Sequence, residues 1–337
     1  MEVGIGYFGD IDRNPAQELA EQSNAVIQNI IEQSILADKL GLDVVAIGEH
    51  HREDYAVSAP HIVLAGIATV TKKIKLMSAV NVLSSSDPVA LYQAYAIIQA
   101  MSGDRGEIGM GRGSFIESFP VFGYDLKDYE ILFEEKFDLL RELIKNEKVT
   151  WKGEKTPELR NIGIYPRTKK EIPLWLAVGG TPSSVLRAAK HGIPLIVAII
   201  GGQISNFKPL FDYYKHEYIK HGHPIEKMQI GVHTHTLLLK NEEEERMYFK
   251  KYAAQMDRIG KTRAWPSYKW EQFQAGMSPD GALFMGTEQQ IEEKVRYVKE
   301  LFGLTRFIAH MDVGAPGEEM LLNTIHAIAN IKNKIVK

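Results

Sequence analysis

The chain has 337 residues, 45% of them hydrophobic, with 43 acidic against 40 basic side chains and no cysteine. The nearly balanced charge offers no basic surface for nucleic acid, and the lack of cysteine excludes disulfides, thiolate metal sites and a cysteine nucleophile. No apolar run is long enough to span a bilayer, and the first residues lack a secretion signal, so we expect a cytoplasmic protein that does not bind membranes.

The first half of the chain alternates predicted strands with predicted helices. Isoleucines recur on one helical face within 23–40, and Phe133 opens a second such stripe that continues to Ile144. Asp87 followed by Pro88 is typical of a helix start. Four runs have the length and apolar character of buried strands: 3–8, 43–48, 74–80 and 106–110.

The second half repeats this alternation with two interruptions. Residues 148–171 are polar and rich in proline, which we interpret as an excursion from the fold. Residues 261–283 are irregular and carry two tryptophans, and we interpret them either as a lid over a site or as an ordered surface loop. Helix starts are predicted at Thr181-Pro182 and at Thr287 with Gln290. Four further strands are predicted: 174–178, 195–200, 229–239 and 306–311.

Eight strands alternating with helices favour a (β/α)₈ barrel, formed by one domain over 1–337 with excursions after the fourth and seventh strands. An open doubly wound sheet is the alternative. In either fold, function is expected where the strands end. Polar residues do follow the strands, at 48–51, 81–86, 109–113, 179–184 and 310–312.

The second strand ends in Gly48-Glu49-His50-His51, which places ionisable groups at the expected site. Because adjacent residues on a strand point to opposite faces, we expect at most one of the two histidines to face that site.

The turn after the fifth strand is a candidate anion site. Gly179 and Gly180 let a ligand approach the backbone, Thr181 and Ser184 offer hydroxyls, and the helix start adds its positive dipole end. Arg112, one strand earlier, would contribute a permanently charged guanidinium suited to phosphate. The alternative is that the glycines only permit a tight turn and that Arg112 pairs with a local carboxylate.

His233 and His235 suggest a rival assignment, a metal-dependent hydrolase on the same kind of barrel. Together with His50, His51 and Asp312 they are the ligand types such an enzyme needs. The order along the chain is wrong, however, because such hydrolases carry a His-x-His pair on the first strand. We interpret the pair as strand alternation, with one histidine buried and one lining the site, and expect no metal.

Taken together, several motifs resemble the bacterial-luciferase-like family of flavin-dependent monooxygenases. The resemblance is clearest from Gly48 to Gly123 and extends loosely over nearly the whole chain. Gly111 stands where the light-emitting enzyme has a reactive cysteine. The acidic residue that the light-emitting enzyme carries soon after the arginine is not clearly preserved around Glu117-Ser118. Both departures argue against light emission. The motifs are Gly48-Glu49-His50-His51, Asp87-Pro88-Val89, Ser102-Gly103-Asp104-Arg105, 109–113 with Val121-Phe122-Gly123, 186–192, and Met285-Gly286-Thr287-Glu288.

The resemblance implies a (β/α)₈ barrel that binds reduced FMN, or a deazaflavin in some branches, and dimerises through its second and third helices. It implies that His50 is the acid/base residue and that Arg112, with Gly180, Thr181 and Ser184, binds the flavin phosphate. It also implies a non-proline cis peptide at Ser78–Ala79, with Ala79 and Asn81 near the flavin ring.

The function implied is a monooxygenase in which reduced FMN and O₂ oxidise a small organic substrate, with a separate flavin reductase as partner. A barrel that binds flavin without catalysis is a further alternative. The substrate is not specified, because the large aromatic side chains fit a core as well as a pocket wall: Phe8, Phe115, Trp175, Trp265 and Trp270.

Overall fold

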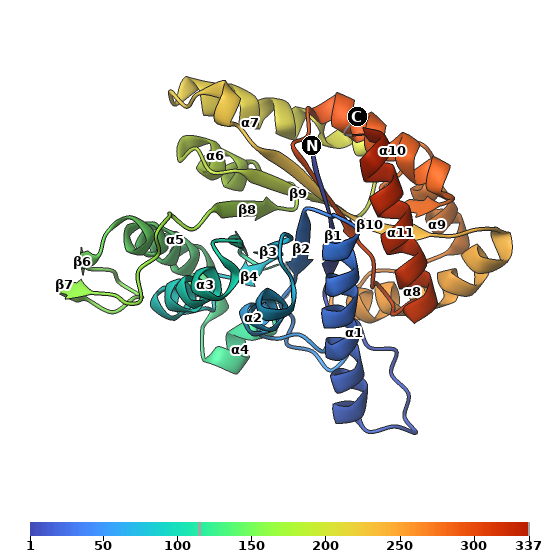
Figure 1. The fold of residues 1–337 in the computed structure, drawn as a ribbon, viewed down its shortest axis with the longest axis horizontal. Helices are drawn as coiled ribbons and strands as arrows, with labels where there is room; N and C mark the ends of the chain where they lie inside the picture. The colour runs from blue at the N-terminus through green and yellow to red at the C-terminus, as the bar shows by residue number, and fades with distance from the viewer. Residues whose placement is uncertain (114–115, 336–337) are drawn as a thin grey trace.

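A computed structural model describes residues 1–113 and 116–335 of the chain (Figure 1). Eight of the described strands are parallel, and the pairing of β9 with β10 closes them into a ring, so the predicted (β/α)₈ barrel is confirmed. The strands are β1 (Glu2–Tyr7), β2 (Val44–Ile47), β3 (Lys75–Ser78), β5 (Gly106–Gly111), β8 (Leu174–Val178), β9 (Leu195–Ile199), β10 (Ile230–Leu238) and β12 (Arg306–His310).

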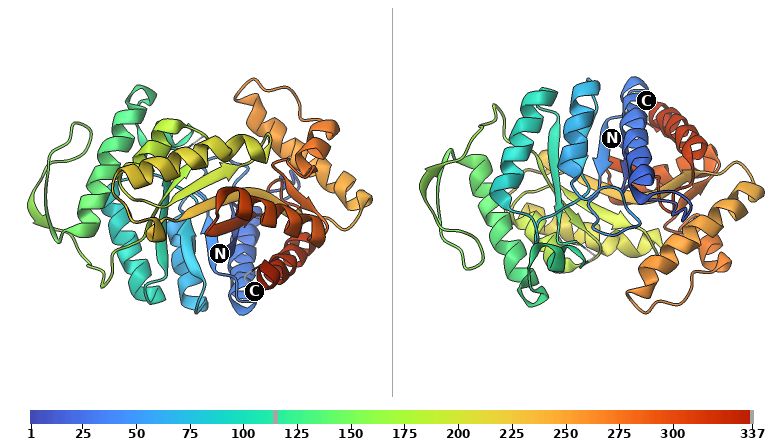
Figure 2. Two further views of the ribbon diagram at one scale, coloured as in Figure 1. Left: turned by 90° about the horizontal axis from the view of Figure 1, so that it is seen from above. Right: turned by 90° about the horizontal axis from the view of Figure 1, so that it is seen from below.

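Helices surround the ring of strands in both views of Figure 2. Two of the predicted caps are confirmed: Asp87 accepts a hydrogen bond from the backbone N–H of Ala90, and Thr287 forms a capping box with Gln290. The main helices around the ring are α1 (Leu19–Lys39), α2 (Pro60–Val70), α3 (Pro88–Ser102), α5 (Tyr129–Lys145), α6 (Pro182–Lys190), α7 (Lys208–Lys220), α10 (Glu288–Phe302) and, after the last barrel strand, α11 (Glu318–Ile335).

The excursions contain structure that the sequence did not reveal. An antiparallel pair, β6 (Lys148–Trp151) and β7 (Leu159–Gly163), lies at the far left of Figure 1. The stretch 261–283, predicted to be irregular, contains a helix, because Trp270 and Phe273 pack as an apolar face against α8. Helix α8 (Glu242–Lys261) precedes that stretch and α9 (Trp270–Met277) lies within it. The other elements missed are β4 (Asn81–Val82), α4 (Ser118–Phe122) and β11 (Phe284–Gly286).

The amino-terminal end of the barrel is closed by a buried ion cluster. Arg306 is 0% exposed, and its guanidinium bonds to the carboxylates of Glu2 and Glu107. The same guanidinium lies 4.1 Å from the ring centre of Trp175, and Lys75 reaches Glu107 at 3.2 Å. This cluster lies at the opposite end of the strands from the predicted site.

Strands β3 and β5 approach each other closely at the predicted flavin side. A Cβ built on Gly109 would lie 1.9 Å from the carbonyl oxygen of Ser78, so this position requires glycine. The Ser78 hydroxyl bonds to both the N–H and the carbonyl of Gly109. The non-proline cis peptide is Ala79–Val80, so the predicted position, Ser78–Ala79, was wrong by one residue. The prediction placed the strand end two residues too late, since β3 ends at Ser78.

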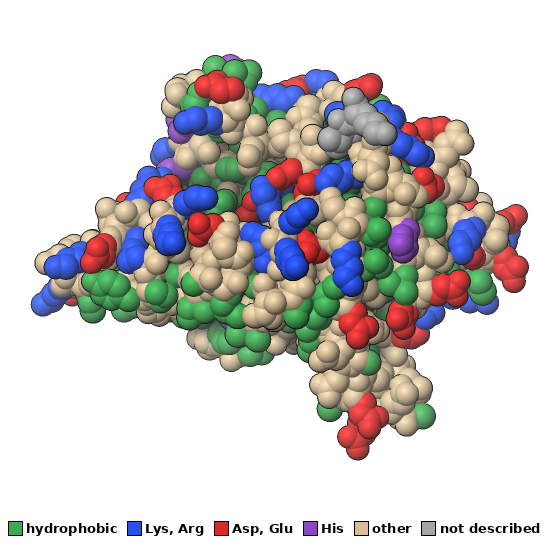
Figure 3. Space-filling view, in the orientation of Figure 1, with side chains coloured by type: hydrophobic (Ala, Val, Ile, Leu, Met, Phe, Trp, Pro, Cys, Tyr) green, Lys and Arg blue, Asp and Glu red, His purple; other side chains and the backbone are tan. Residues whose placement is uncertain are grey.

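The molecular surface mixes charges of both signs (Figure 3). Hydrophobic side chains gather along the lower edge of that view, over the region of α2, α3 and α4 in Figure 1. Among the described residues, no helix combines the length and apolar character needed to cross a membrane.

Candidate active site

A cavity of about 1070 Å³ lies at the carboxyl ends of the barrel strands. Every barrel strand contributes to its wall, either with residues of the strand itself, as β10 does, or from the loop that follows it. Residues after β1, β2 and β5 meet residues of β10 and β12 there, and the 261–283 stretch supplies much of the remaining wall. The segments that sequence analysis marked as chemically active therefore converge on one space.

His50 lines this cavity and is held by aromatic contacts. Its ring stacks on Tyr55 with 4.2 Å between centroids and meets the edge of Phe8 at 4.6 Å. Its Nδ1 atom lies 3.9 Å from a carboxylate oxygen of Glu117. Burial lowers the pKa of His50, and Glu117 opposes part of that shift. The ring is therefore neutral near pH 7 and able to accept a proton.

His51 also lines the cavity, so the expectation that at most one of the two histidines faces the site was wrong. The reason is that β2 ends at Ile47, and the alternation of a strand does not continue into the loop. Glu49 holds His51 at 2.9 Å and accepts a hydrogen bond from the backbone N–H of Val82. Glu49 thus ties the end of β2 to β4.

The predicted anion turn opens toward the cavity. Gly179, Thr181 and Ser184 line it together with Arg112, because β5 and β8 are neighbours in the sheet. Thr181 precedes α6, and within the described chain its hydroxyl makes no capping bond. A Cβ built on Gly179 or Gly180 meets no described atom within 4 Å, so there is room in front of the turn. Hydroxyls, a helix start and free space suit a phosphate group.

Arg112 is engaged by a carboxylate. Its guanidinium pairs with Glu130, whose side chain is 64% exposed, and lies 5.4 Å from the ring centre of Tyr129. A second guanidinium, that of Arg187 on α6, pairs with Glu134 nearby. Burial lowers the pKa of Arg187, and the charge of Arg112 lowers it further. Sequence reasoning missed Arg187, since only the fold brings α6 and α5 together.

Of the residues predicted beneath the flavin ring, Ala79 lines the cavity, whereas Ser78 and Asn81 are buried away from it. The side-chain oxygen of Asn81 accepts a hydrogen bond from the Tyr95 hydroxyl at 3.2 Å. The side chains of Ser78 and Asn81 therefore support the floor of the cavity.

His233 and His235 both line the cavity and are both buried. The interpretation with only one of them lining the site was wrong, because residues two apart on a strand share a face. His235 bonds through Nδ1 to the hydroxyl of Tyr252 at 2.8 Å. His233 Nε2 lies 3.1 Å from Nδ1 of His310, so β10 and β12 are joined by an imidazole pair.

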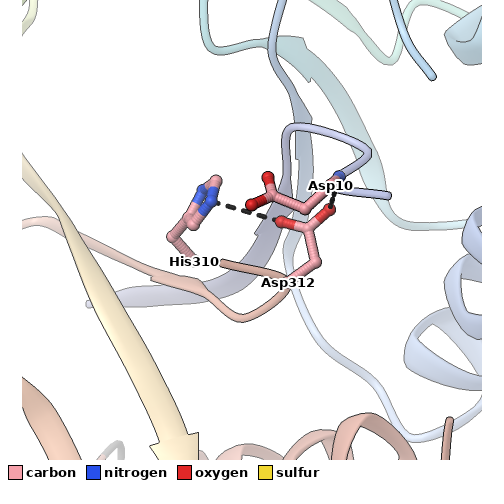
Figure 4. A group of neighbouring side chains, drawn as sticks. All are labelled: Asp10, His310 and Asp312. Atoms are coloured by element: carbon pink, nitrogen blue, oxygen red, sulfur yellow. Dashed lines mark hydrogen bonds and ion pairs between the residues drawn. The ribbon is translucent and has the colours of Figure 1, made fainter. Parts of the chain in front are cut away.

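Asp10, His310 and Asp312 form a buried group whose ligand atoms lie within 4.8 Å of one another (Figure 4). Asp312 accepts backbone hydrogen bonds from Phe8 and Gly9, and its Oδ1 lies 3.2 Å from Nε2 of His310. Both nitrogens of His310 therefore face protein partners. Oδ1 of Asp10 and Nε2 of His310 have no hydrogen-bond partner among the described residues, so this group is not a closed hydrogen-bonded network, and the absence of a metal stays a prediction.

Replacing Asp10 by asparagine is expected to stabilise the fold at alkaline pH. Burial raises the pKa of Asp10 well above its usual range, and Asp312 adds to the shift. A raised pKa in the folded state means that stability is lost as pH rises from the ordinary carboxyl range through the folded pKa. Asparagine can still accept from Gly314 and carries no charge.

We expect Asp10→Asn to gain about 1 kcal/mol over the unmodified protein at about pH 8 and little at about pH 4. Urea unfolding at both pH values measures this. Asp12→Asn, at an exposed position, is the control, and an Asp10→Asn advantage that does not grow with pH contradicts the prediction.

The 261–283 stretch is packed as part of the wall. Lys294 donates to carbonyl oxygens of Gly276 and Ser278, and burial lowers its pKa to about 7. Trp265 and Phe8 line the cavity, Trp175 and Trp270 pack elsewhere in the protein, and Phe115 lies outside the described residues. The role of this stretch as a lid stays a prediction.

Comparison with known proteins gives matches over most of the chain. The family model of luciferase-like monooxygenases matches residues 1–305. Uncharacterized protein y4vJ of Sinorhizobium fredii (strain NBRC 101917 / NGR234) is 31% identical over 189 residues, which are 55% of this chain and 53% of that protein. The alkanal monooxygenase alpha chain of the Kryptophanaron alfredi symbiont is 25% identical over 59% of this chain and 56% of its own. The matches span about half the length of these two relatives.

Solved structures share the fold at low sequence identity. Monooxygenase RslO1 from Streptomyces bottropensis superposes with a TM-score of 0.85 at 20% identity, covering 100% of both chains. The oxygenating constituent of 3,6-diketocamphane monooxygenase from Pseudomonas putida, solved in complex with FMN, has a TM-score of 0.73 at 16% identity over 98% and 97% of the chains. An F420-dependent secondary alcohol dehydrogenase has a TM-score of 0.73 at 18% identity, over 97% and 99%.

Proposed function

This chain belongs to the luciferase-like monooxygenase family, and we propose that it is an FMN-dependent monooxygenase that uses reduced flavin and O₂ to oxidise a small organic substrate. One observation carries the proposal: Arg112, the Thr181 turn and His50 line the same cavity at the carboxyl ends of the strands. An anchor for a phosphate and a buried, neutral imidazole thus share one space.

The residues present fit a flavin phosphate. The open turn at Gly179, the hydroxyls of Thr181 and Ser184, and Arg112 would hold it, and Ala79 would face the ring. Reduced FMN would supply the electrons that activate oxygen. His50 would accept or return a proton beside the reacting atoms, which requires the neutral ring that burial maintains.

FMN is proposed over a deazaflavin, although structural neighbours include both an FMN complex and an F420-dependent enzyme. A separate flavin reductase belongs to the proposal, as does a homodimer formed through α2 and α3. Exposed apolar side chains support that interface: Ile62, Val70, Ile97 and Met101.

Titration with oxidised and reduced FMN, and with F420, followed by oxygen uptake tests the function. The substrate panel would contain an aliphatic aldehyde, an alkane, a cyclic ketone, an alkanesulfonate and a phenol. We expect tight binding of reduced FMN and oxygen uptake that rises with one substrate class.

Reduced-FMN binding with no substrate-dependent uptake would favour a non-catalytic flavin-binding protein. Preference for F420 would correct the cofactor. Bound metal in the purified protein, with no affinity for either flavin, would favour the hydrolase instead.

Replacing Glu130 by glutamine is expected to strengthen FMN binding about three- to tenfold, because the exposed carboxylate competes with the flavin phosphate for Arg112. Arg112→Ala should weaken binding about tenfold or more. Fluorescence titration measures both. The control is Glu142→Gln, at an exposed position of α5. The Glu142 carboxylate accepts a hydrogen bond from Asn146 and does not pair with Arg112. Weaker binding by Glu130→Gln would show that the carboxylate instead orients Arg112 for the ligand.

A further inference from the structure

We propose that His233 is a second proton-accepting residue of this active site, held in one tautomer by His310 and Asp312, and that it takes a proton from an O–H or N–H group of the substrate. The inference rests on the proposed function, because it places the substrate in the same cavity. It follows from a chain of contacts that begins at a carboxylate and ends at the cavity wall.

The first link is the carboxylate of Asp312, which the backbone holds in place. Its oxygens accept backbone N–H groups from Phe8 at 3.0 Å, Gly9 at 2.7 Å and Asp10 at 3.3 Å (Figure 4). These bonds fix the orientation of the carboxylate, so that its Oδ1 also faces an imidazole.

That imidazole is the ring of His310, whose Nε2 lies 3.2 Å from Oδ1 of Asp312. The two atoms make no hydrogen bond among the described residues, but a carboxylate oxygen this close favours the tautomer with the proton on Nε2, which leaves Nδ1 of His310 as an acceptor. His233 Nε2 lies 3.1 Å from that acceptor. It must therefore carry its own proton on Nε2, and the lone pair of His233 is then on Nδ1.

The ring of His233 cannot easily leave this arrangement. A Cβ built on Gly6 would lie 2.7 Å from Nε2 of His233, so the absent side chain of β1 makes the space that the ring fills. Within the described chain, the hydrogen bond to His310 is the one found for this ring, and His233 lines the cavity with 9% of its surface exposed. The Nδ1 lone pair is thus left for a ligand.

The surroundings keep His233 uncharged until it reacts. Burial lowers the pKa of His233 well below its usual range, and the neighbouring His310 and His235 lower it further. The other ionisable groups that line the cavity near these strands are Asp10 after β1, His50 after β2 and Tyr252 on α8.

The proposed step is a simple proton transfer. The substrate O–H or N–H bond breaks, its electron pair stays on the substrate atom, and the proton forms a bond to Nδ1 of His233. The resulting positive charge is shared along the Nε2–H contact with His310, which faces the anion of Asp312. A substrate activated in this way carries an ionisable hydroxyl or N–H, as a phenol or an enol does, rather than being a plain alkane.

Nitrogen NMR of protein labelled with ¹⁵N-histidine tests the tautomers without any ligand. We expect His233 to carry its proton on Nε2 with Nδ1 unprotonated, and His310 to carry a proton on Nε2, and their signals are assigned from His233→Gln and His310→Gln. Asp312→Asn should change the tautomer of His310, whereas His326→Gln, at an exposed position of α11, should leave both rings unchanged. A protonated Nδ1 on His233 in the unmodified protein overturns the proposal, whether or not any variant folds.

The second measurement is 4-nitrophenol binding in the unmodified protein saturated with FMN, because the absorbance of this probe distinguishes phenol from phenolate. We expect bound probe to ionise at lower pH than free probe, and His233→Gln to remove that shift while FMN affinity stays within about twofold. Equal ionisation in both proteins, or no probe binding, overturns the inference. Failure of the proposed function would appear differently, as no affinity of the unmodified protein for FMN, with the NMR result still deciding the tautomer.

Discussion

Replacing Arg306 by alanine is expected to lower the free energy of unfolding by about 3 kcal/mol, because the buried carboxylate of Glu107 then keeps only the partly exposed Lys75 as a cationic partner. Glu107 is 4% exposed and would lose its closest cationic partner. Burial raises the pKa of Glu2, but the charge of Arg306 and the contact with Lys75 lower it below its usual value. Glu2 would lose the first of these two favourable partners. The face of Trp175 would also lose a stacked guanidinium.

Urea unfolding followed by circular dichroism measures the loss. The matched control is Arg296→Ala, which removes an exposed pair with Glu292 on α10 and should change stability by about 0.5 kcal/mol or less. Combining Arg306→Met with Glu107→Gln should recover much of the stability, since no buried charge is then left alone. If Arg306→Ala unfolds at the same urea concentration as Arg296→Ala, the cluster does not hold the barrel together.

The barrel could be predicted from the sequence because its strands and helix starts have local sequence signals. Runs such as 174–178 are apolar on both faces, and the cap at Asp87 follows from side-chain chemistry within four residues. The strand ends are equally local, which is why His50, Arg112 and the Thr181 turn were found as a group. Their convergence on one cavity then follows from the parallel order of the strands.

What the sequence could not supply is which partner each side chain meets. Nothing local pairs Arg112 with Glu130 on the next helix, or joins His233 to His310 across 77 residues. The cis peptide was carried over from the family resemblance and misplaced by one residue, because a resemblance in motifs does not fix which single bond of a turn is cis. The face shared by His233 and His235 was available from strand geometry and was misread.

The sequence could also not show how the histidine after β2 is held. His50 lies between Tyr55 and Phe8, and Gln255 of α8 donates a hydrogen bond to the Tyr55 hydroxyl at 2.9 Å. Gly48 makes room for Phe8, since a Cβ built there would lie 2.2 Å from its ring. His50 is thus held by its own loop, by the residue that follows β1 and, through Tyr55, by α8.

Replacing His50 by asparagine is expected to lower substrate-dependent oxygen uptake by about 10²–10³-fold while reduced-FMN affinity stays within about threefold. Asparagine approximates the shape of part of the imidazole and keeps a polar atom beside Phe8, but it cannot accept a proton. Stopped-flow oxidation of reduced FMN, with and without the substrate that the panel identifies, separates binding from turnover.

The pH dependence distinguishes a catalytic role of His50 from packing. Because burial lowers the pKa of His50, a step that needs the neutral ring should gain rate as pH rises through a value below the usual imidazole range and then level off. His50→Asn should lack that limb, whereas His51→Asn should retain it, since His51 is held by Glu49. A structural defect would lower the rate at every pH and keep the shape of the profile. Unchanged turnover in His50→Asn would show that His50 does not transfer a proton, while the proposed flavin-binding site would be unaffected by that result.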